Sequence, residues 1–441
     1  MNNEYLIRLI HEYNPQLVGR QFEVAEFRRD LYLEIEPWIA KKQALAIVGL
    51  RRTGKTTLMR QLMSGMEPGT LFFSFDEEET QKKEVLIFVV DYAVNVVHAT
   101  SIFLDEIHYV KDWEGVLKRY YDQKHCKFIL SGSESLELSK AKATLAGRLI
   151  TFQLDTLSFS EYLRLKGAAV PETTGAFGDF FALEQLYNTC LVQKEYYEHE
   201  FLEYLYKGAF PELIREEDST IIRRYIADLV VRKIIYRDIP AIFDIRRRDL
   251  LYDLFLFACS TTSCLFDIQN LSRTLNASHE TVTSYLFFIR AAFLIRVAEP
   301  YSKSPAKRMR RHKKVYVAHP SIACAVLGYD RPQLIEPVLG PFVETLFAGK
   351  FFWRDKEKNE VDVIVESTGL IPVEIKYQSQ ISPADTKSLR RFMEIHTVGK
   401  AVLVTKNIFE RRTVDGNEIL LIPAWLALLH PPSGTGKSAR I

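Results

Sequence analysis

Eight residues near the start of the chain, Gly49 to Thr56, constrain the fold more than any other segment. They match the phosphate-binding loop pattern G-x-x-x-x-G-K-[ST] at every fixed position. The apolar run 44–48 before them predicts a buried strand, and residues 57–63 after them predict a helix. This order of strand, loop and helix is the context in which the pattern binds phosphate. We therefore expect an α/β domain on a parallel sheet that binds a nucleoside triphosphate.

Each fixed position of the loop has a chemical reason. The glycines let the backbone point its N–H groups at phosphate oxygens, and Lys55 brings a positive charge to the β- and γ-phosphates. The Thr56 hydroxyl suits Mg²⁺, which prefers oxygen ligands. Arg51 and Arg52 are expected to contact phosphate or a neighbouring subunit. The predicted site for ATP and Mg²⁺ consists of Gly49, Arg51, Arg52, Thr53, Gly54, Lys55, Thr56 and Thr57.

Composition adds few constraints. The 441 residues suffice for two to four domains, and 47% hydrophobic with 26% charged residues is typical of soluble globular proteins. The five cysteines are scattered without a C-x-x-C pair, which indicates a reducing cytoplasm. The start lacks the layout of a signal peptide. Residues 85–104 are apolar but contain Asp91 and His98, so we expect a helix and a strand there, and no membrane span.

The pattern of elements changes along the chain. An arm and an amphipathic helix, with Phe27, Leu31 and Ile35 on one face, are expected over residues 1–40. Strands and helices alternate as far as residue 154, and residues 158–256 are helical and rich in aromatic and charged residues. Mixed α and β patterns return from residue 331. The strand-rich runs there are 361–366, 370–376 and 400–405.

Two carboxylates end a predicted buried strand downstream of the loop. Asp105 is expected to order the Mg²⁺ shell, and Glu106 to polarise the attacking water. The next strand ends in Ser131 and Ser133, beside the expected γ-phosphate. One of these serines positions the water, or both are only small polar residues at a strand end.

Arg148 follows that second strand by fifteen or so residues, in the run Leu-Ala-Gly-Arg. An arginine supplied by a neighbouring subunit can stabilise charge on a transferring phosphoryl group. Arg148 is therefore a candidate finger for a homo-oligomer. The alternative is an ordinary solvated surface arginine.

A helix–turn–helix pattern occupies residues 266–289, with Ser278 as the expected N-cap of the second helix. A strand beginning near residue 293 and a basic segment without acids follow it, where a wing hairpin would contact DNA phosphates. The candidate DNA-binding residues are Lys303, Lys307, Arg308, Arg310, Arg311, Lys313 and Lys314. Winged helices also bind proteins, and a basic loop can simply be solvated.

Four residues near the C-terminal end suggest a nuclease-like site. Asp362 lies on a predicted strand, while Glu374 and Lys376 share a face of the next strand. With Glu344 on a helix, they resemble the restriction-endonuclease-like pattern Glu…Asp…Glu-x-Lys, as found in archaeal Holliday-junction resolvases. That resemblance implies Mg²⁺ bound by Asp362 and Glu374 and cleavage of phosphodiesters. Cross-strand salt bridges give the same pattern, and nuclease folds also persist as docking modules without cleavage.

The chain as a whole resembles a large group of archaeal and bacterial AAA-type ATPases. Their loop commonly reads G-x-R-R-x-G-K-T, as residues 49–56 do here. Residues 103–108 resemble the group's second motif, and residues 130–133 its sensor strand, where threonine is more usual than Ser131. Further similar segments are 145–148, 157–162 and 208–212. The resemblance implies a helical lid, a winged helix and a nuclease-like end domain, but no settled biological role.

These observations define an expected organisation. The domains are an N-terminal arm and helix (1–40), a P-loop ATPase core (41–155), a helical lid (156–256), a winged helix (257–330), a restriction-endonuclease-like domain (331–430) and a disordered tail (431–441). The expected function is ATP turnover that drives DNA binding or remodelling, with branched DNA such as Holliday junctions among the candidate substrates, by a homo-oligomer that forms a ring or hexamer. The alternative is a nucleotide-gated switch whose winged helix binds a protein partner.

Overall fold

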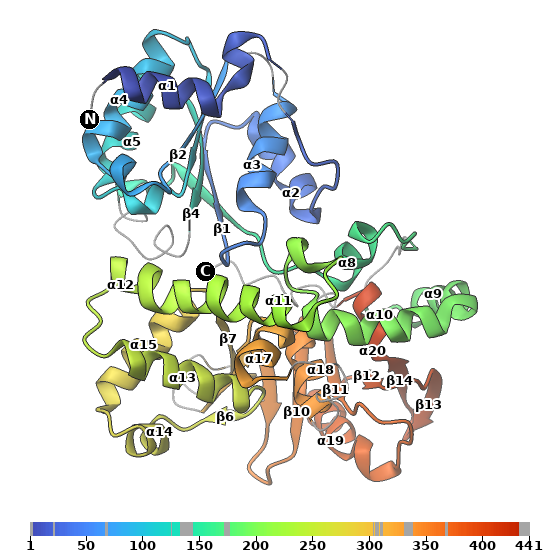
Figure 1. Ribbon diagram of the computed structural model, residues 1–441. Helices are drawn as coiled ribbons and strands as arrows, with labels where there is room; N and C mark the ends of the chain where they lie inside the picture. The colour runs from blue at the N-terminus through green and yellow to red at the C-terminus, as the bar shows by residue number, and fades with distance from the viewer. Residues whose placement is uncertain are drawn as a thin grey trace. The chain divides into compact units, whose positions relative to one another are not determined.

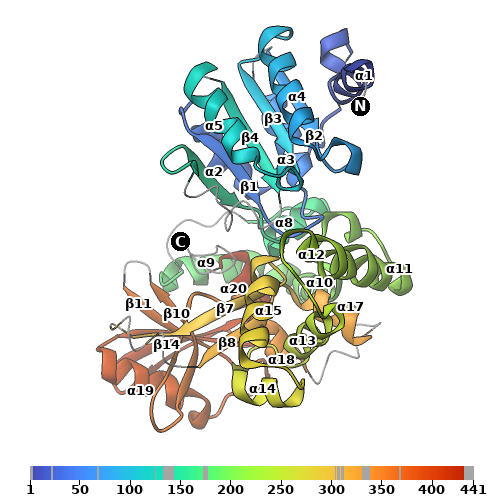
Figure 2. The same ribbon diagram turned by 90° about the vertical axis from the view of Figure 1, so that its left-hand side faces the viewer.

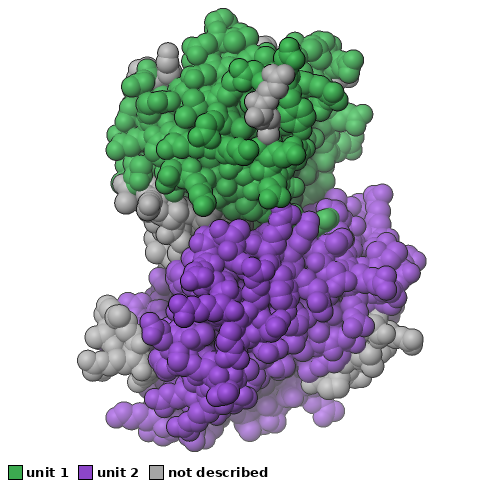
Figure 3. Space-filling view, turned by 60° about the vertical axis from the view of Figure 1, so that its left-hand side comes forward, with its two compact units in different colours: residues 1–154 green, residues 155–441 purple. Residues whose placement is uncertain are grey.

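A division after Leu154 separates two units of the chain, residues 1–154 and 155–441 (Figure 3). The structure is a computed structural model. It describes residues 3–20, 23–66, 69–124, 126–132, 144–171, 177–302, 304, 308, 312–329, 338–366 and 369–431. The tail expected at 431–441 lies outside the described residues, apart from Pro431.

The first unit is built on a five-stranded sheet whose strands are all parallel. The strand order is β2-β3-β4-β1-β5. Four of the five strands are buried along their whole length, as expected for a parallel sheet covered on both faces. The strands are β1 (Ala44–Val48), β2 (Thr70–Ser74), β3 (Ser101–Asp105), β4 (Lys127–Gly132) and β5 (Leu149–Gln153). The expected parallel α/β core is confirmed.

Helices cover this sheet on both sides. Figure 1 shows α2 and α3 on one side and α4 and α5 on the other. A cluster of buried side chains fills the space between α2, α3 and the sheet, including Ile35, Leu58 and Phe103. The helices of the unit are α1 (Asn3–Tyr13), α2 (Asp30–Ile39), α3 (Lys55–Ser64), α4 (Lys83–Asn95) and α5 (Trp113–Lys124).

The N-terminal region differs from the expected arm and single helix. It contains two helices, and α2 begins at Asp30, so Phe27 lies outside it. After α1, the Asn14 side chain bonds to the edge strand β2: its Nδ2 donates to the Phe72 carbonyl and its Oδ1 accepts from the Phe72 N–H, both at 2.7 Å. This amide takes the place of a neighbouring strand, which satisfies backbone groups at the sheet edge.

The first part of the second unit is helical. Its helices include a segment with π-helical hydrogen bonding, labelled η6 and η7, that continues from α11. The elements are α8 (Phe159–Leu165), α9 (Phe180–Cys190), α10 (Lys194–Lys207), α11 (Ser219–Arg224), η6 (Tyr225–Arg232), η7 (Ile234–Asp238), α12 (Ile239–Ile242), α13 (Arg248–Ser260), α14 (Ile268–Thr274), α15 (His279–Ala291), α17 (Pro320–Leu327), α18 (Leu339–Phe347), α19 (Lys387–His396) and α20 (Ala424–Leu429).

A nine-stranded sheet runs through the rest of this unit in the order β13-β14-β12-β11-β10-β9-β7-β8-β6. The strands are β6 (Leu265–Phe266), β7 (Ile295–Pro300), β8 (Lys313–Val317), β9 (Phe351–Arg354), β10 (Glu360–Glu366), β11 (Leu370–Ile375), β12 (Lys400–Thr405), β13 (Glu410–Val414) and β14 (Asn417–Pro423).

Parallel pairing of β7 with β9 joins two regions that the sequence predicts as separate domains. The hairpin of β7 and β8, expected as part of a winged helix, therefore continues into the sheet of the expected end domain (Figure 2). Helix α19 packs on this sheet through Leu389, Phe392 and Met393. The continuous sheet brings residues of the two regions into direct contact.

Candidate functional site

The predicted phosphate-binding loop lies between the carboxyl end of β1 and the first turn of α3. A Cβ at Gly49 would lie 2.1 Å from the carbonyl oxygen of Leu154, so no larger residue fits there. Gly54 has a φ of +96°, in the left-handed region that favours glycine, directly before α3. The two fixed glycines of the motif are thus explained by space and by backbone conformation.

The Lys55 side chain lies inside the loop and is only 5% exposed. Its Nζ donates to the carbonyl oxygens of Gly49 at 3.0 Å and Leu50 at 3.2 Å. Thr53 Oγ1 donates to the same Leu50 oxygen at 2.9 Å. Phosphate oxygens would offer Lys55 stronger acceptors, because hydrogen bonds between ionised groups are shorter and stronger. The ammonium group is therefore held where bound phosphates would need it.

Asp105 lies beside the loop because β3, β4 and β1 are neighbours and their carboxyl ends meet at one edge. Its Oδ2 accepts a hydrogen bond from Thr56 Oγ1 at 2.8 Å, and its Oδ1 accepts one from Ser131 Oγ. Burial, and then the nearby Glu106, raise the pKa of Asp105 to about 6, against the hydrogen bonds of Ser131 and Thr56 and the charge of Lys55. Adjacent hydroxyl and carboxylate oxygens fit the ligand preference of Mg²⁺.

Glu106 follows with a φ of +51°, an uncommon conformation for a residue other than glycine. Its backbone N–H donates to Ser131 Oγ at 3.0 Å, so Ser131 contacts both acidic residues of the motif. The Glu106 Oε2 lies 3.2 Å from Nδ1 of the buried His108. Ser131 therefore links the Asp105 carboxylate to the Glu106 backbone, and the His108 ring lies beside the Glu106 carboxylate. Ser133 lies outside the described residues.

Other residues of the predicted site are peripheral. Arg51 Nη2 lies 3.9 Å from Asp76 Oδ1, and Thr57 is exposed on the first turn of α3. Arg52 has a φ of +64°. Sequence reasoning missed Arg29, a buried residue whose Nη1 donates to the Thr53 carbonyl oxygen at 2.7 Å. Its place 24 residues before Thr53 forms no motif, so no sequence signal could have identified this support of the loop.

Arg148 lies at the opposite end of the sheet from the loop. Leu149 is paired with Ala44, the first residue of β1, whereas the loop follows its last residue, Val48. The Arg148 side chain contacts Asp122 of α5, with Nε to Oδ1 at 3.0 Å and Nη2 to Oδ2 at 3.3 Å. In its own subunit, Arg148 is therefore distant from the loop, whereas the prediction places it at the loop of a neighbouring subunit.

The four residues of the predicted nuclease-like site lie on neighbouring elements. The register of β10 and β11 pairs Val363 with Val373, which places Asp362 opposite Glu374. Asp362 Oδ2 accepts from the Ile375 N–H at 2.9 Å, and Lys376 Nζ lies 2.8 Å from Glu374 Oε1. Burial, followed by the Asp362 charge, raises the pKa of Glu374 well above its usual value, against the pull of Lys376.

Glu344 on α18 is connected to this group by Lys314, which was predicted to bind DNA. Lys314 Nζ lies 2.9 Å from Glu344 Oε1 and 3.2 Å from Asp362 Oδ1. Tyr316 Oη donates to the same Glu344 oxygen at 2.8 Å. Burial, and then the Asp362 charge, raise the pKa of Glu344 to about 7, although Lys314 and Tyr316 act to lower it.

The prediction that Lys314 contacts DNA from an exposed wing is wrong. Its side chain is 3% exposed and pairs with carboxylates of α18 and β10, because the hairpin strand β8 belongs to the same sheet as β10. Lys313 is half-exposed and lies 3.3 Å from Glu299 of β7. The Arg308 guanidinium lies 5.4 Å from the ring centroid of Phe351. The other predicted DNA-binding residues, Lys303, Lys307, Arg310 and Arg311, lie outside the described residues.

Helices α14 and α15 form the predicted helix–turn–helix segment. Ser278 caps α15, since its Oγ accepts from the Thr281 N–H at 3.1 Å, and Val282, Tyr285 and Ile289 are buried. The first helix is shorter than expected, because β6 takes up Phe266 and Asp267 becomes the N-cap.

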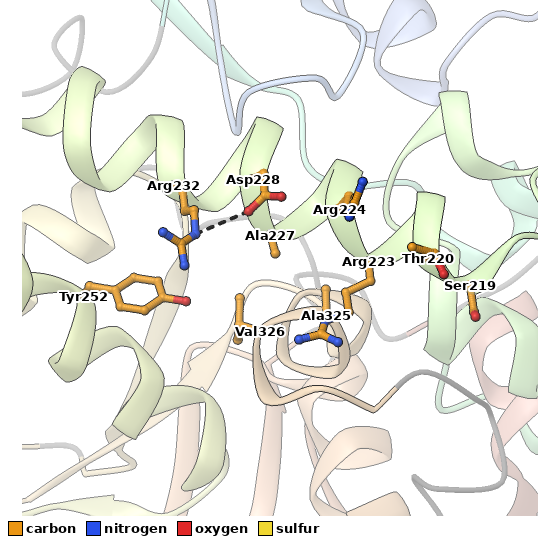
Figure 4. A pocket seen from close by; sticks show the side chains of 10 residues that line it. All are labelled: Ser219, Thr220, Arg223, Arg224, Ala227, Asp228, Arg232, Tyr252, Ala325 and Val326. Carbon is orange, nitrogen blue, oxygen red and sulfur yellow. Dashed lines mark ion pairs between the residues drawn. The ribbon is translucent and has the colours of Figure 1, made fainter.

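A shallow groove of about 380 Å³ lies along α11 and η6 (Figure 4). Ala227 and Val326 lie between Arg223 and Arg232 in this view. Arg232 is partly neutralised by Asp228, 3.3 Å from its Nε. The lining residues are Ser219, Thr220, Arg223, Arg224, Ala227, Asp228, Arg232, Tyr252, Ala325 and Val326. The groove thus combines hydroxyls and arginines with an apolar floor.

A parallel sheet with this loop between β1 and α3, and with a buried aspartate at the end of β3, is the arrangement of a P-loop nucleotide-binding domain. Residues 41–163 match the family model described as an AAA domain. Residues 198–333 and 346–425 match two further models, described as domains of unknown function (DUF8612 and DUF4143). Among the described residues, no helix is long and apolar enough to cross a membrane.

Relatives along most of the chain are themselves uncharacterized. One from Methanocaldococcus jannaschii is 24% identical over 97% of this chain and 93% of its own length, and one from Haemophilus influenzae is 22% identical over 86% and 93%. Among solved structures, the Aeropyrum pernix ORC1 protein in complex with DNA has a TM-score of 0.29 at 10% identity, covering 74% of this chain and 92% of that one. The Thermotoga maritima RuvB Holliday junction branch migration motor has a TM-score of 0.31 at 15% identity, covering 66% of this chain and 92% of that one.

Proposed function

We propose that the chain hydrolyses ATP and couples this to binding or remodelling of DNA. The observation that carries the ATPase part is the hydrogen bond between Thr56 and Asp105, beside a Lys55 ammonium already enclosed by the loop. Thr56 and Asp105 would hold Mg²⁺ directly or through its water shell. Mg²⁺ bound there would neutralise charge on the phosphates.

The roles of the chain's own residues follow from their positions. Lys55 would bind the β- and γ-phosphates, and Glu106 would polarise the attacking water. Ser131 and His108 would keep the two carboxylates in place, through the contacts described above. Measuring ATP turnover with and without single-stranded, duplex and four-way-junction DNA tests both parts of the proposal. No turnover under any condition would contradict the ATPase part, and turnover unaffected by every DNA would contradict the coupling.

The DNA part is supported by charge. Without the buried Lys314, the segment 301–313 has six lysines and arginines and no acid, and the groove along α11 and η6 adds Arg223 and Arg224. Cationic side chains that neutralise phosphates supply most of the affinity of sequence-independent DNA binding. We further propose that the protein acts in the cytoplasm as a homo-oligomer, a ring or hexamer, in which Arg148 serves a neighbouring subunit.

The end domain is proposed to be nuclease-like, with Glu344, Asp362, Glu374 and Lys376 as its site. Its support is the placement of these residues around one pair of strands. Their oxygen atoms are ligands that a hard cation would accept, but Lys314 already contacts two of the four residues. Either cleavage of DNA or docking without cleavage is compatible with this arrangement.

One observation favours the alternative of a switch with a protein partner. Helix α15, the second of the helix–turn–helix pair, carries Arg290 as its single lysine or arginine, and its Phe287 is 46% exposed. Exposed aromatic side chains are typical of protein interfaces. Affinity for DNA that falls with salt would support the first proposal, and binding insensitive to salt would support the switch.

A further inference from the structure

Lys314 is an ammonium group enclosed by carboxylates that belong to other elements. Its Nζ lies 2.9 Å from Glu344 Oε1, 2.6 Å from Glu360 Oε1 and 3.2 Å from Asp362 Oδ1. Glu344 comes from α18 and the other two from β10, whereas Lys314 comes from β8. Four ionisable groups from three elements therefore meet at one nitrogen, in a place that solvent barely reaches.

A divalent cation bound by Glu344 and Asp362 would need the position that this nitrogen occupies. Oxygen ligands surround Mg²⁺ or Ca²⁺ at about 2.0–2.6 Å, so the carboxylates would have to close around the metal. Two cations held by the same oxygens repel strongly where water is excluded. In this arrangement, the cluster accommodates the Lys314 ammonium group but cannot hold a metal ion at the same time.

We propose that Lys314 is the resident cation of this acidic cluster, and that Glu344 and Asp362 bind a divalent metal only after Lys314 has been withdrawn. The inference rests on the nuclease-like site proposed above and is independent of the ATPase. Glu374, opposite Asp362 on the paired strand β11, has a buried Oε2 with no hydrogen-bond partner among the described residues.

Withdrawal of Lys314 is coupled to the hairpin. The Lys314 backbone pairs with Ala298 of β7 and with Leu265 of β6, so a strand held on both sides carries the side chain into the cluster. β8 begins at Lys313, within the basic segment proposed to contact DNA. A ligand that displaces the hairpin would therefore open the acidic cluster, and an undisturbed hairpin keeps it closed to metal.

Mn²⁺ binding to the nucleotide-free full chain tests this, measured by electron paramagnetic resonance with Asp105→Asn in every sample to remove the other metal site. We expect Lys314→Met to bind one Mn²⁺ per chain at least about tenfold more tightly than the chain with Lys314. Adding Asp362→Asn should abolish the gain. Lys314→Arg, which keeps the charge, and Lys313→Met, the half-exposed neighbour, should show no gain.

Two results would overturn the proposal. One is a folded Lys314→Met chain, judged by circular dichroism, that gains no Mn²⁺ site. The other result is obtained with Lys314 in place. If that chain binds Mn²⁺, and Asp362→Asn abolishes the binding, lysine and metal coexist in the cluster. If Lys314→Met fails to fold, this second comparison decides alone, and the absence of such Asp362-dependent binding is then the expected result. Cleavage of DNA or ATP turnover does not enter the measurement, so failure of either activity remains distinguishable from failure of this inference.

Discussion

Substitutions at two residues of the first unit should distinguish nucleotide binding from nucleotide hydrolysis. Lys55→Ala removes the charge that faces the phosphates, so ATP binding and turnover should both be lost. Glu106→Gln keeps the shape but removes the carboxylate that polarises water, so ATP should still bind while turnover falls by about 10²–10⁴-fold. Equilibrium binding of a fluorescent ATP analogue and phosphate release measure the two quantities.

The exposed Glu84 on α4 offers a matched control, because Glu84→Gln makes the same change away from the site. It should leave both quantities unaltered. Normal turnover in Glu106→Gln would remove Glu106 from the proposed mechanism.

The residues of the loop itself could be predicted because their chemistry is encoded in consecutive positions. The role of Ser131 could not, since it depends on the adjacency of β3 and β4: its hydroxyl donates to Asp105 and accepts from the Glu106 N–H. Arg29 supports the loop through a contact that no local pattern signals.

At the scale of elements, the basic hairpin segment gives a prediction about DNA. Replacing Arg308, Arg310 and Arg311 with glutamine should weaken DNA binding and flatten its salt dependence. Each lost phosphate contact should reduce the log–log slope by about 0.9, or about 2.7 for all three. Fluorescence anisotropy with labelled duplex between low and moderate salt measures the slope.

Lys356→Gln with Lys358→Gln, in the exposed turn between β9 and β10, is the control and should leave the slope unchanged. The same titration on Arg223→Gln with Arg224→Gln reports whether the groove shares the contact. An unchanged slope in the hairpin variant would assign its charges to a partner other than DNA.

Helix α17 gives a prediction about pH. Its N-cap His319 is buried, and Nδ1 accepts from the Ser321 N–H at 3.1 Å, so the ring must stay neutral. Burial, and then the Arg296 charge, lower the pKa of His319 to about 3 from 6.5. Between these values the unfolded chain binds the proton and the folded chain does not. The contribution of His319 to the free energy of unfolding is therefore complete above pH 6.5. It falls by about 1.4 kcal/mol per pH unit toward pH 3.

Urea denaturation at pH 7.5, 6 and 5 measures the free energy of unfolding of the second unit at each pH. His319→Asn keeps a capping oxygen without the titrating ring. Its free energy of unfolding should fall less steeply over the same range, whatever its absolute value. Equal slopes in the two proteins would show that His319 takes up a proton in the folded state.

Elements were easier to predict than the contacts between them. Alternation and capping residues predicted the hairpin, the helix–turn–helix and the strands at 361–366 and 400–405. The burial of Lys314 could not be predicted, because its partners lie 30 to 48 residues away and are brought near it by long-range contacts such as the β7–β9 pairing. Basic residues that are close in sequence predict an exposed segment. Only the order of the strands shows which of them are buried.

At the scale of the whole molecule, the position of Arg148 leads to a test of the proposed assembly. Ala44 and the loop are separated by the five residues of β1, about 16 Å at the rise of a strand. An arginine side chain cannot span that distance along the sheet, so Arg148 does not reach the phosphates of its own subunit. Its half-exposed ion pair with Asp122 contributes little stability, about 0.2–1 kcal/mol, and is easily exchanged for another partner.

If Arg148 acts on a neighbour, two inactive variants should restore each other. Arg148→Ala subunits keep an intact loop, and Lys55→Ala subunits keep an intact arginine, so mixed oligomers contain some complete sites. Phosphate release from the mixture should exceed the sum of the two variants measured alone. Asp122→Asn, which frees Arg148 without removing it, should keep its activity and serves as the control. A protein that stays monomeric during turnover, or a mixture no more active than its parts, would make Arg148 a surface residue that α5 merely holds in place.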